Sequence, residues 1–166
     1  MKGAKRHEDE VGLDKGGLDK SELAARPVGR AVDPRLTERI EQLLIGSPVA
    51  RRLGIELQEL VVDRATLSLP FRAENVTIED IVHGGVIAAL IDVAGVAAAL
   101  SGAEFETLRG SATGSLSISY LSPARSVALR AEAVVLRRGR RQVVIDVSVT
   151  AGTIAVAKAL ATTLLF

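Results

Sequence analysis

The chain contains 166 residues, 48% of them hydrophobic, which is enough for one folded domain with its own apolar core. Its 21 lysine and arginine residues nearly balance its 20 aspartate and glutamate residues, so the net charge gives no general attraction to nucleic acid or to an anionic membrane. The lack of cysteine excludes disulfides and thiolate chemistry, and the two histidines, His7 and His83, are too far apart in sequence to suggest a zinc site.

The first 30 residues are rich in charge and in glycine. Such a segment buries too little apolar surface to offset the entropy lost on ordering, so we expect a flexible charged tail over residues 1–30 and one folded domain over residues 31–166. The charged start also lacks the apolar run of a secretory signal, and the longest apolar run of the chain is short and carries an acid at its middle. We therefore expect a cytoplasmic protein without a membrane span.

A helix is predicted from Pro34 to Ile45. Asp33 precedes it as an N-cap, Pro34 suits the first helical position, and Gly46 follows as a stop signal. A short helical turn then leads into an extended segment, and residues 59–71 alternate in polarity as one strand does. Residues 73–82 lack such a period and are expected to form a loop.

A long apolar helix is predicted to begin at Gly84 or Gly85 and to end near Leu100. It is apolar around most of its circumference, which is typical of a helix buried by other elements. Its only charged residue is Asp92. A carboxylate is costly to bury without a partner or a proton, so Asp92 is the best candidate for a catalytic residue. The alternative is a structural acid that pairs with an arginine or caps a neighbouring helix.

Four strands are predicted after this helix, at residues 112–121, 127–137, 142–150 and 153–166. Ser122-Pro123, Arg138-Gly139 and Ala151-Gly152 provide the turns between them. Strands joined by such short connections run antiparallel, so we expect a meander. The sequence therefore predicts an α+β domain in which one long helix lies across a curved antiparallel sheet.

Three motifs follow one another along the chain: HGG followed by an acid after six further residues, a strand that ends in YLSPA, and the basic hairpin RRGRR. With these motifs in this order, the chain resembles the PaaI-like group of hotdog-fold acyl-CoA thioesterases. The resemblance covers residues 34–166 and implies a hotdog fold and the hydrolysis of an acyl-CoA to a free acid and coenzyme A. We expect no metal or redox cofactor, because water, a carboxylate and a backbone donor suffice for this reaction.

The resemblance implies that Asp92 acts as a nucleophile or as a general base on water. Poor solvation in an apolar helix would raise the pKa of this carboxyl and make it a better base. Gly84 would offer its free N–H to the oxyanion, aided by the helix dipole, and Gly85 would let the chain approach the substrate closely. HGG could instead be only a tight turn into a helix.

The resemblance also implies that His83 positions the loop near the thioester and that the hydroxyl of Thr113 holds the attacking water. Many relatives have an asparagine six residues before the histidine, whereas this chain has Thr77 there. Asn75, eight residues before His83, is the nearest asparagine. Either Asn75 reaches the site through a longer loop, or this protein works without the amide.

Relatives hold the phosphates of coenzyme A near the basic hairpin, so Arg138, Gly139, Arg140 and Arg141 are candidate substrate-binding residues, although such a cluster is often only a solvated turn. The resemblance further implies a homodimer that joins its sheets edge to edge and builds each active site from both protomers. Two such dimers would form a homotetramer. The alternatives are a non-catalytic acyl-CoA-binding hotdog protein, a hotdog dehydratase or hydratase, and a structural oligomer.

Overall fold

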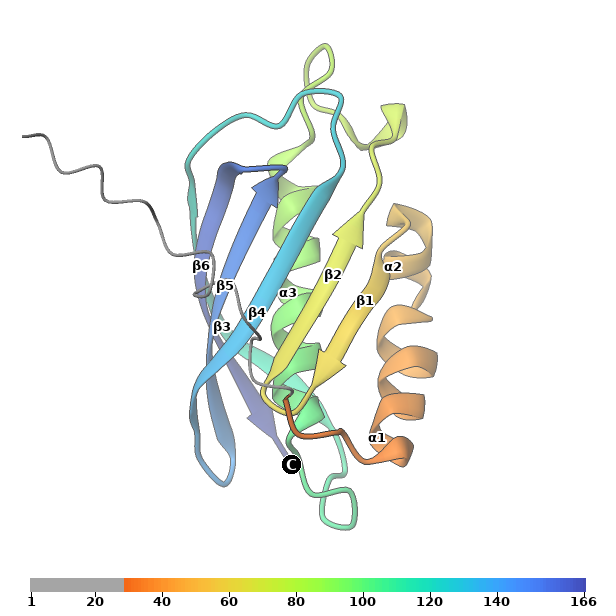
Figure 1. Cartoon of the computed structure of the whole chain (residues 1–166), viewed down its shortest axis with the longest axis vertical. Coiled ribbons are helices and arrows are strands. Elements are labelled where there is room, and N and C mark those ends of the chain that lie inside the picture. The colour runs from red at the N-terminus through yellow and green to blue at the C-terminus, as the bar shows by residue number, and fades with distance from the viewer. Residues whose placement is uncertain (1–28) are drawn as a thin grey trace, which may run out of the picture.

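The computed structural model describes residues 29–166, in which a curved antiparallel sheet wraps one long helix (Figure 1). The predicted α+β fold class is confirmed. The predicted tail of residues 1–30 lies outside the described residues, except for Gly29 and Arg30. The carbonyl of Arg30 accepts a hydrogen bond from the amide of Val62 at 2.9 Å, so the described chain begins against the sheet.

Three short helical segments precede the sheet: α1 (Pro34–Arg39), η2 (Ile40–Ile45) and α2 (Pro48–Leu53). The carboxylate of Asp33 caps α1 by accepting from the Arg35 amide at 2.9 Å, as predicted. The helix ends at Gly46, also as predicted, but η2 is a π-helix, in which the Gly46 amide donates to the Glu41 carbonyl at 2.8 Å.

The next segment is a hairpin of β1 (Glu56–Val61) and β2 (Arg64–Leu69), so the single strand predicted over residues 59–71 is wrong. The chain reverses at Val62 and Asp63, and Asp63 takes the left-handed conformation with a φ of 67°. Aspartate tolerates this conformation better than most residues. The turn contains no glycine or proline, and the apolar residues continue into it, which is why the polarity pattern hid it.

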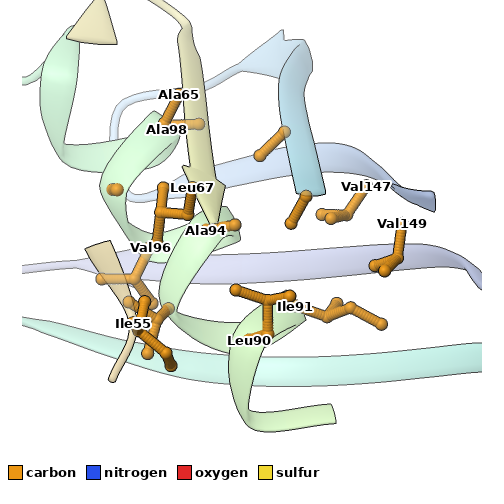
Figure 2. Close-up of a cluster of buried hydrophobic side chains, with 14 of the residues drawn as sticks. Ile55, Ala65, Leu67, Leu90, Ile91, Ala94, Val96, Ala98, Val147 and Val149 are labelled. Atoms are coloured by element: carbon orange, nitrogen blue, oxygen red, sulfur yellow. The ribbon is translucent and has the colours of Figure 1, made fainter. Parts of the chain in front are cut away.

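The helix α3 (Gly84–Ser101) follows the short segment η3 (Ala73–Asn75) and forms the centre of the core. By length and composition α3 could also cross a membrane, but 67% of it is buried inside this protein. Figure 2 shows Leu90, Ile91 and Ala94 from α3 gathered with Leu67 and Val147 from the sheet. Burial of each large aliphatic side chain contributes about 1.5–3 kcal/mol, so helix and sheet stabilise each other.

The remaining strands are β3 (Ser111–Tyr120), β4 (Leu129–Arg138), β5 (Gln142–Ala151) and β6 (Ile154–Leu165). These agree with the four predicted strands to within a few residues. The sheet order is β1-β2-β4-β5-β6-β3, and every pair is antiparallel. The predicted meander is therefore wrong at one step, because β3 pairs with β6 and not with β4. This crossover leaves β3 at an edge of the sheet, beside α3.

Candidate active site

Asp92 on α3 and Thr113 on β3 are hydrogen-bonded to each other, although they are 21 residues apart in sequence. The Thr113 hydroxyl donates to Oδ1 of Asp92 at 2.5 Å. Asp92 is half-buried, because it lies on the face of α3 next to the edge strand β3. The carboxylate is thus less shielded in the single chain than the apolar sequence around it suggests, and a molecule that covers this edge would shield it further.

His83 caps the start of α3. Its Nδ1 accepts a hydrogen bond from the Gly85 amide at 2.8 Å. Because Nδ1 is the acceptor, the neutral imidazole carries its proton on Nε2. A Cβ at Gly85 would lie 3.0 Å from Nδ1, which is tighter than most real contacts, so a larger residue at this position would push the imidazole out of its present place. The positioning role predicted for His83 has a direct structural basis here.

Gly84 presents a free donor at the start of α3. Its N–H has no acceptor among residues 29–166, while its carbonyl accepts a hydrogen bond from the Tyr120 hydroxyl at 2.9 Å. The first amides of a helix lack intrahelical partners and lie at the positive end of its dipole. A Cβ at Gly84 would lie 3.5 Å from the Tyr120 ring, an ordinary contact, so packing within the chain does not require glycine here.

Gly84 and Asp92 cannot act on the same group within one protomer. They lie on one straight helix and are separated by eight residues, which corresponds to about 12 Å along the axis. One carbonyl group cannot bind the Gly84 N–H and also meet a water held by Asp92 over that distance. Within one chain the carboxylate and the free amide are therefore too far apart to act on one carbonyl group.

Asn75 supports the loop that leads into α3. It is 6% exposed, its side-chain amide donates to the Leu53 carbonyl at 3.3 Å, and its own carbonyl accepts from the His83 amide at 2.8 Å. These contacts tie the HGG segment to α2. The amide nitrogen of Asn75 thus points at α2 in this chain, and a direct contact with substrate stays a prediction.

The loop before HGG is also fastened to the loop between β3 and β4. Arg125 donates to Glu79 and Asp80 at 3.0 and 2.8 Å, and the Ser126 hydroxyl donates to Asp80 at 3.0 Å. The Ser126 hydroxyl and the Arg125 guanidinium together hold the pKa of Asp80 below its usual value. Sequence reasoning missed this clamp, because its partners are 45 or more residues apart.

The structure gives Arg138 a structural role that was not predicted. Its Nε and one Nη donate to Oδ1 of Asp63 at 2.8 and 2.6 Å, and the Asp63 amide donates to the Ser101 hydroxyl at 2.9 Å. Arg138 therefore fastens the β1–β2 turn to the C-terminal end of α3, and a contact of this residue with phosphate stays a prediction. Arg140 and Arg141 are exposed, and their side chains make no hydrogen bond or ion pair to residues 29–166.

The family model described as the thioesterase superfamily matches residues 79–158, which include the HGG segment, Asp92, Thr113 and the basic hairpin. This part of the chain is therefore similar to the thioesterase superfamily. A curated Saccharolobus solfataricus protein, named as a putative esterase, is 29% identical over 109 residues, which are 66% of this chain and 71% of that protein.

In the part of the chain that the structure describes, no three histidine, cysteine or acidic side chains lie together as the ligands of a metal ion would.

Two solved structures share the fold of this chain. The PaaI protein of the E. coli phenylacetic acid degradation operon has a TM-score of 0.72 at 20% identity and matches 82% of this chain and 96% of its own. A hypothetical thioesterase protein from Streptococcus pneumoniae, solved with coenzyme A, has a TM-score of 0.61 at 21% identity and matches 68% of this chain and 85% of its own. These likenesses confirm the predicted hotdog fold.

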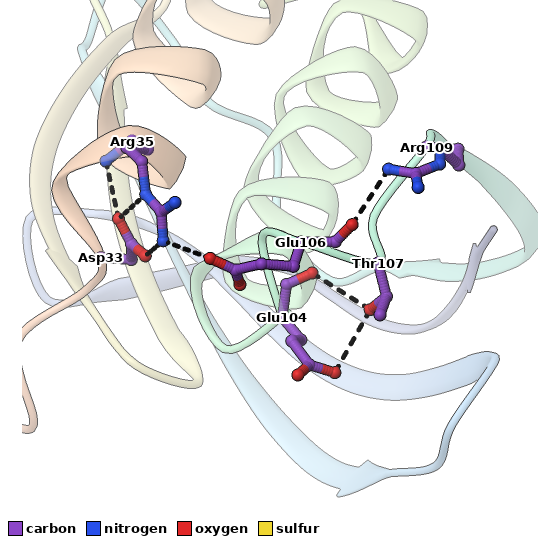
Figure 3. Close-up of polar contacts among 6 residues, drawn as sticks. All are labelled: Asp33, Arg35, Glu104, Glu106, Thr107 and Arg109. Atoms are coloured by element: carbon purple, nitrogen blue, oxygen red, sulfur yellow. Dashed lines mark hydrogen bonds and ion pairs between the residues drawn. The ribbon is translucent and has the colours of Figure 1, made fainter.

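A polar cluster joins the start of α1 to the loop after α3 (Figure 3). Arg35 donates to Asp33 and Glu106 at 2.6 and 2.8 Å, and its guanidinium lies 4.3 Å from the centre of the Phe105 ring. The hydrogen bonds from Arg35 lower the pKa values of Asp33 and Glu106 below their usual values. The cluster holds α1, and the η2 segment that continues it, beside α3.

A cavity of about 210 Å³ lies between η2 and the face of α3 that carries Asp92. Val96 and Leu100 line it from α3, one and two turns beyond Asp92. Leu43 and Leu44 line it from η2. The cavity is therefore mainly apolar and lies along the same face of α3 as Asp92, although Asp92 itself does not line it.

Two further cavities lie at the two ends of α3. One of about 300 Å³ borders Gly84 and Tyr120. The other, of about 590 Å³, is lined by Arg140 and Arg141 at the C-terminal end of α3. Leu108 lines both this large cavity and the 210 Å³ cavity, so the two adjoin.

Proposed function

We propose that this protein is an acyl-CoA thioesterase that works as a homodimer with composite active sites. The observation that carries the proposal is the pair of half-sites: a carboxylate held by a threonine hydroxyl, and a free helix-start amide about 12 Å away on the same helix. Each half-site supplies what the other lacks for thioester hydrolysis, a base and an oxyanion donor.

The edge strand β3 supports the dimer. One side of β3 pairs with β6, and its other side has no partner strand among residues 29–166. Thr113 lies near one end of β3 and Tyr120 at the other. Antiparallel pairing of β3 with its copy, centred near Leu116 and Ser117, would place Asp92 and Thr113 beside Gly84 of the partner subunit. The homotetramer stays a prediction.

The proposed chemistry needs no group beyond these. Asp92 accepts a proton from water while the water oxygen attacks the thioester carbonyl, and the N–H of Gly84 of the partner subunit donates to the oxygen that becomes negative. The carbon–sulfur bond then breaks, and the leaving thiolate takes the proton from Asp92. The products are a carboxylic acid and coenzyme A. Direct attack by Asp92 on the carbonyl, followed by hydrolysis of the anhydride, is the alternative first step.

Thr113 has a defined part in the general-base route. Its hydroxyl hydrogen is donated to Oδ1 of Asp92, so the hydroxyl oxygen remains able to accept a hydrogen bond from the attacking water. The same bond fixes the carboxylate and leaves Oδ2 for the water proton. This arrangement supports the predicted role of Thr113 in holding the nucleophile.

The adjoining cavities provide a path for coenzyme A. Arg140 and Arg141 carry free positive charge at the wide cavity, which suits the phosphates of the nucleotide. The narrower apolar cavity lies along the face of α3 that carries Asp92, and its apolar lining suits the pantetheine arm. The coenzyme A in the Streptococcus pneumoniae protein supports a ligand of this class. Arg138 also lines the wide cavity, but its charge is paired with Asp63, so Arg140 and Arg141 are the stronger candidates for phosphate.

The test is a thiol-release assay on short, medium, long and aromatic acyl-CoAs, with Asp92→Asn as the variant. The amide keeps the shape of the side chain but cannot accept a proton, so we expect kcat to fall by about a hundredfold or more. Thr37→Val serves as the control. It also keeps the shape of a side chain while removing a polar function, but on α1, and should keep full activity. Release by the wild type that persists in Asp92→Asn, or no release at all, would contradict the proposal.

A further inference from the structure

The peptide groups around Gly84 are fixed at several points. The peptide that joins Gly84 to Gly85 is held at both ends, because its carbonyl accepts from the Tyr120 hydroxyl at 2.9 Å and its N–H donates to His83 Nδ1 at 2.8 Å. The preceding amide, that of His83, donates to the Asn75 carbonyl at 2.8 Å. Among residues 29–166, the Gly84 N–H is the member of this segment that has no acceptor.

Tyr120 is the part of this frame that comes from the sheet. His83, Gly85 and Asn75 all belong to α3 or to the loop before it, and they could shift together. Tyr120 belongs to β3, which is paired with β6 along its length and cannot follow such a shift. Its hydroxyl therefore ties the start of α3 to the rigid sheet. The ring is half exposed, so the packing of the ring does not depend on the hydroxyl.

We propose that Tyr120 is a positioning residue for the oxyanion donor. Its hydroxyl holds the Gly84 carbonyl and so keeps the adjacent Gly84 N–H aimed at the substrate of the neighbouring half-site. The inference rests on the proposed thioesterase function, since it assigns Tyr120 a role at that same site. Donors of this kind act only when they are aligned before the charge develops, so loss of alignment lowers the rate of the chemical step more than the binding of substrate.

Tyr120→Phe tests this assignment, because it removes the hydroxyl and keeps the ring. We expect kcat to fall by about tenfold, within the range lost when a whole donor is removed, and KM to change by less than about twofold. Thr37→Val removes a hydroxyl far from Gly84 and should leave both constants unchanged. An unchanged kcat in Tyr120→Phe overturns the inference, and so does a raised KM with an unchanged kcat, which would make the residue part of the binding wall.

A second measurement does not depend on a variant. Tyr120 is the only tyrosine of the chain, so protein produced with 3-fluorotyrosine carries its fluorine at that position alone. Titration with a non-hydrolysable alkyl-CoA thioether should shift the single fluorine resonance, because the ring lies beside Gly84. No shift at saturation overturns the inference even if the wild type is active. A wild type that cleaves no acyl-CoA removes the proposed function itself, which the thiol-release assay detects separately.

Discussion

At the residue scale, the Gly84 N–H is the donor on which the account depends. Gly84→Pro replaces the hydrogen of this N–H by a ring carbon and lets the helix start as before, because proline suits the first position of a helix and His83 before it is already extended, with φ −62° and ψ 133°. Loss of an oxyanion donor predicts a fall in kcat of about a hundred- to a thousandfold. Steady-state kinetics on the best acyl-CoA measure it.

Gly84→Ala is the matched control, because alanine keeps the N–H. Its Cβ would meet the Tyr120 ring at an ordinary 3.5 Å, so the variant should fold and keep most of its activity. Equal activity of the proline and alanine variants would show that the amide of Gly84 does not take part in the reaction.

Single residues could be predicted from the sequence where a local rule singles them out. Asp92 is the one charge in an apolar helix, and the HGG segment marks the start of that helix. Partners across the sheet follow no local rule. The contacts of Tyr120 with Gly84, of Arg138 with Asp63 and of Arg125 with Asp80 depend on strand order, which a polarity pattern does not contain.

At the scale of elements, the long helix and the last four strands were predictable because each has a sustained period and clear turn residues at its ends. The hairpin of β1 and β2 was not, because its turn at Val62 and Asp63 contains neither glycine nor proline and the apolar residues of β1 continue into it. The position of β3 at the sheet edge was not predictable either. The eight residues between β3 and β4 look like a simple turn in sequence, yet they carry the chain across to the other half of the sheet.

The proposed pairing of β3 with its copy makes a prediction for this element. The natural chain has no cysteine, so an introduced one reports its own position. Pairing centred at Ser117 brings this residue opposite its copy at about 5 Å between Cα atoms, within reach of a disulfide. Ser117→Cys should therefore form covalent dimers under mild oxidation, seen on a non-reducing gel.

Ser119→Cys is the control on the same strand. Its side chain is exposed like that of Ser117, but antiparallel pairing would separate it from its own copy by four residues of strand, about 13 Å. It should remain monomeric on the gel. Cross-linking of both variants to the same extent, or of neither, would count against the proposed register.

For the whole molecule, the account needs two chains, although one chain carries every residue of the site. Residues 29–166 contain the core, the sheet, the Asp92–Thr113 pair and the free Gly84 amide, while the proposed meeting of Asp92 with Gly84 calls for a second copy. The cytoplasmic location, the homotetramer and the role of residues 1–30 stay predictions. The composite site is the central claim, and it can be tested by combining two inactive proteins.

The measurement is the activity of a heterodimer of Asp92→Asn and Gly84→Pro, co-expressed with two different affinity tags and purified through both. Each homodimer carries a defect in both of its sites and should be inactive. If each site takes its acid from one protomer and its donor from the other, the heterodimer combines both defects in one site and keeps one intact site, so it should recover about half of the wild-type kcat per dimer. A heterodimer as inactive as the two homodimers would contradict the account.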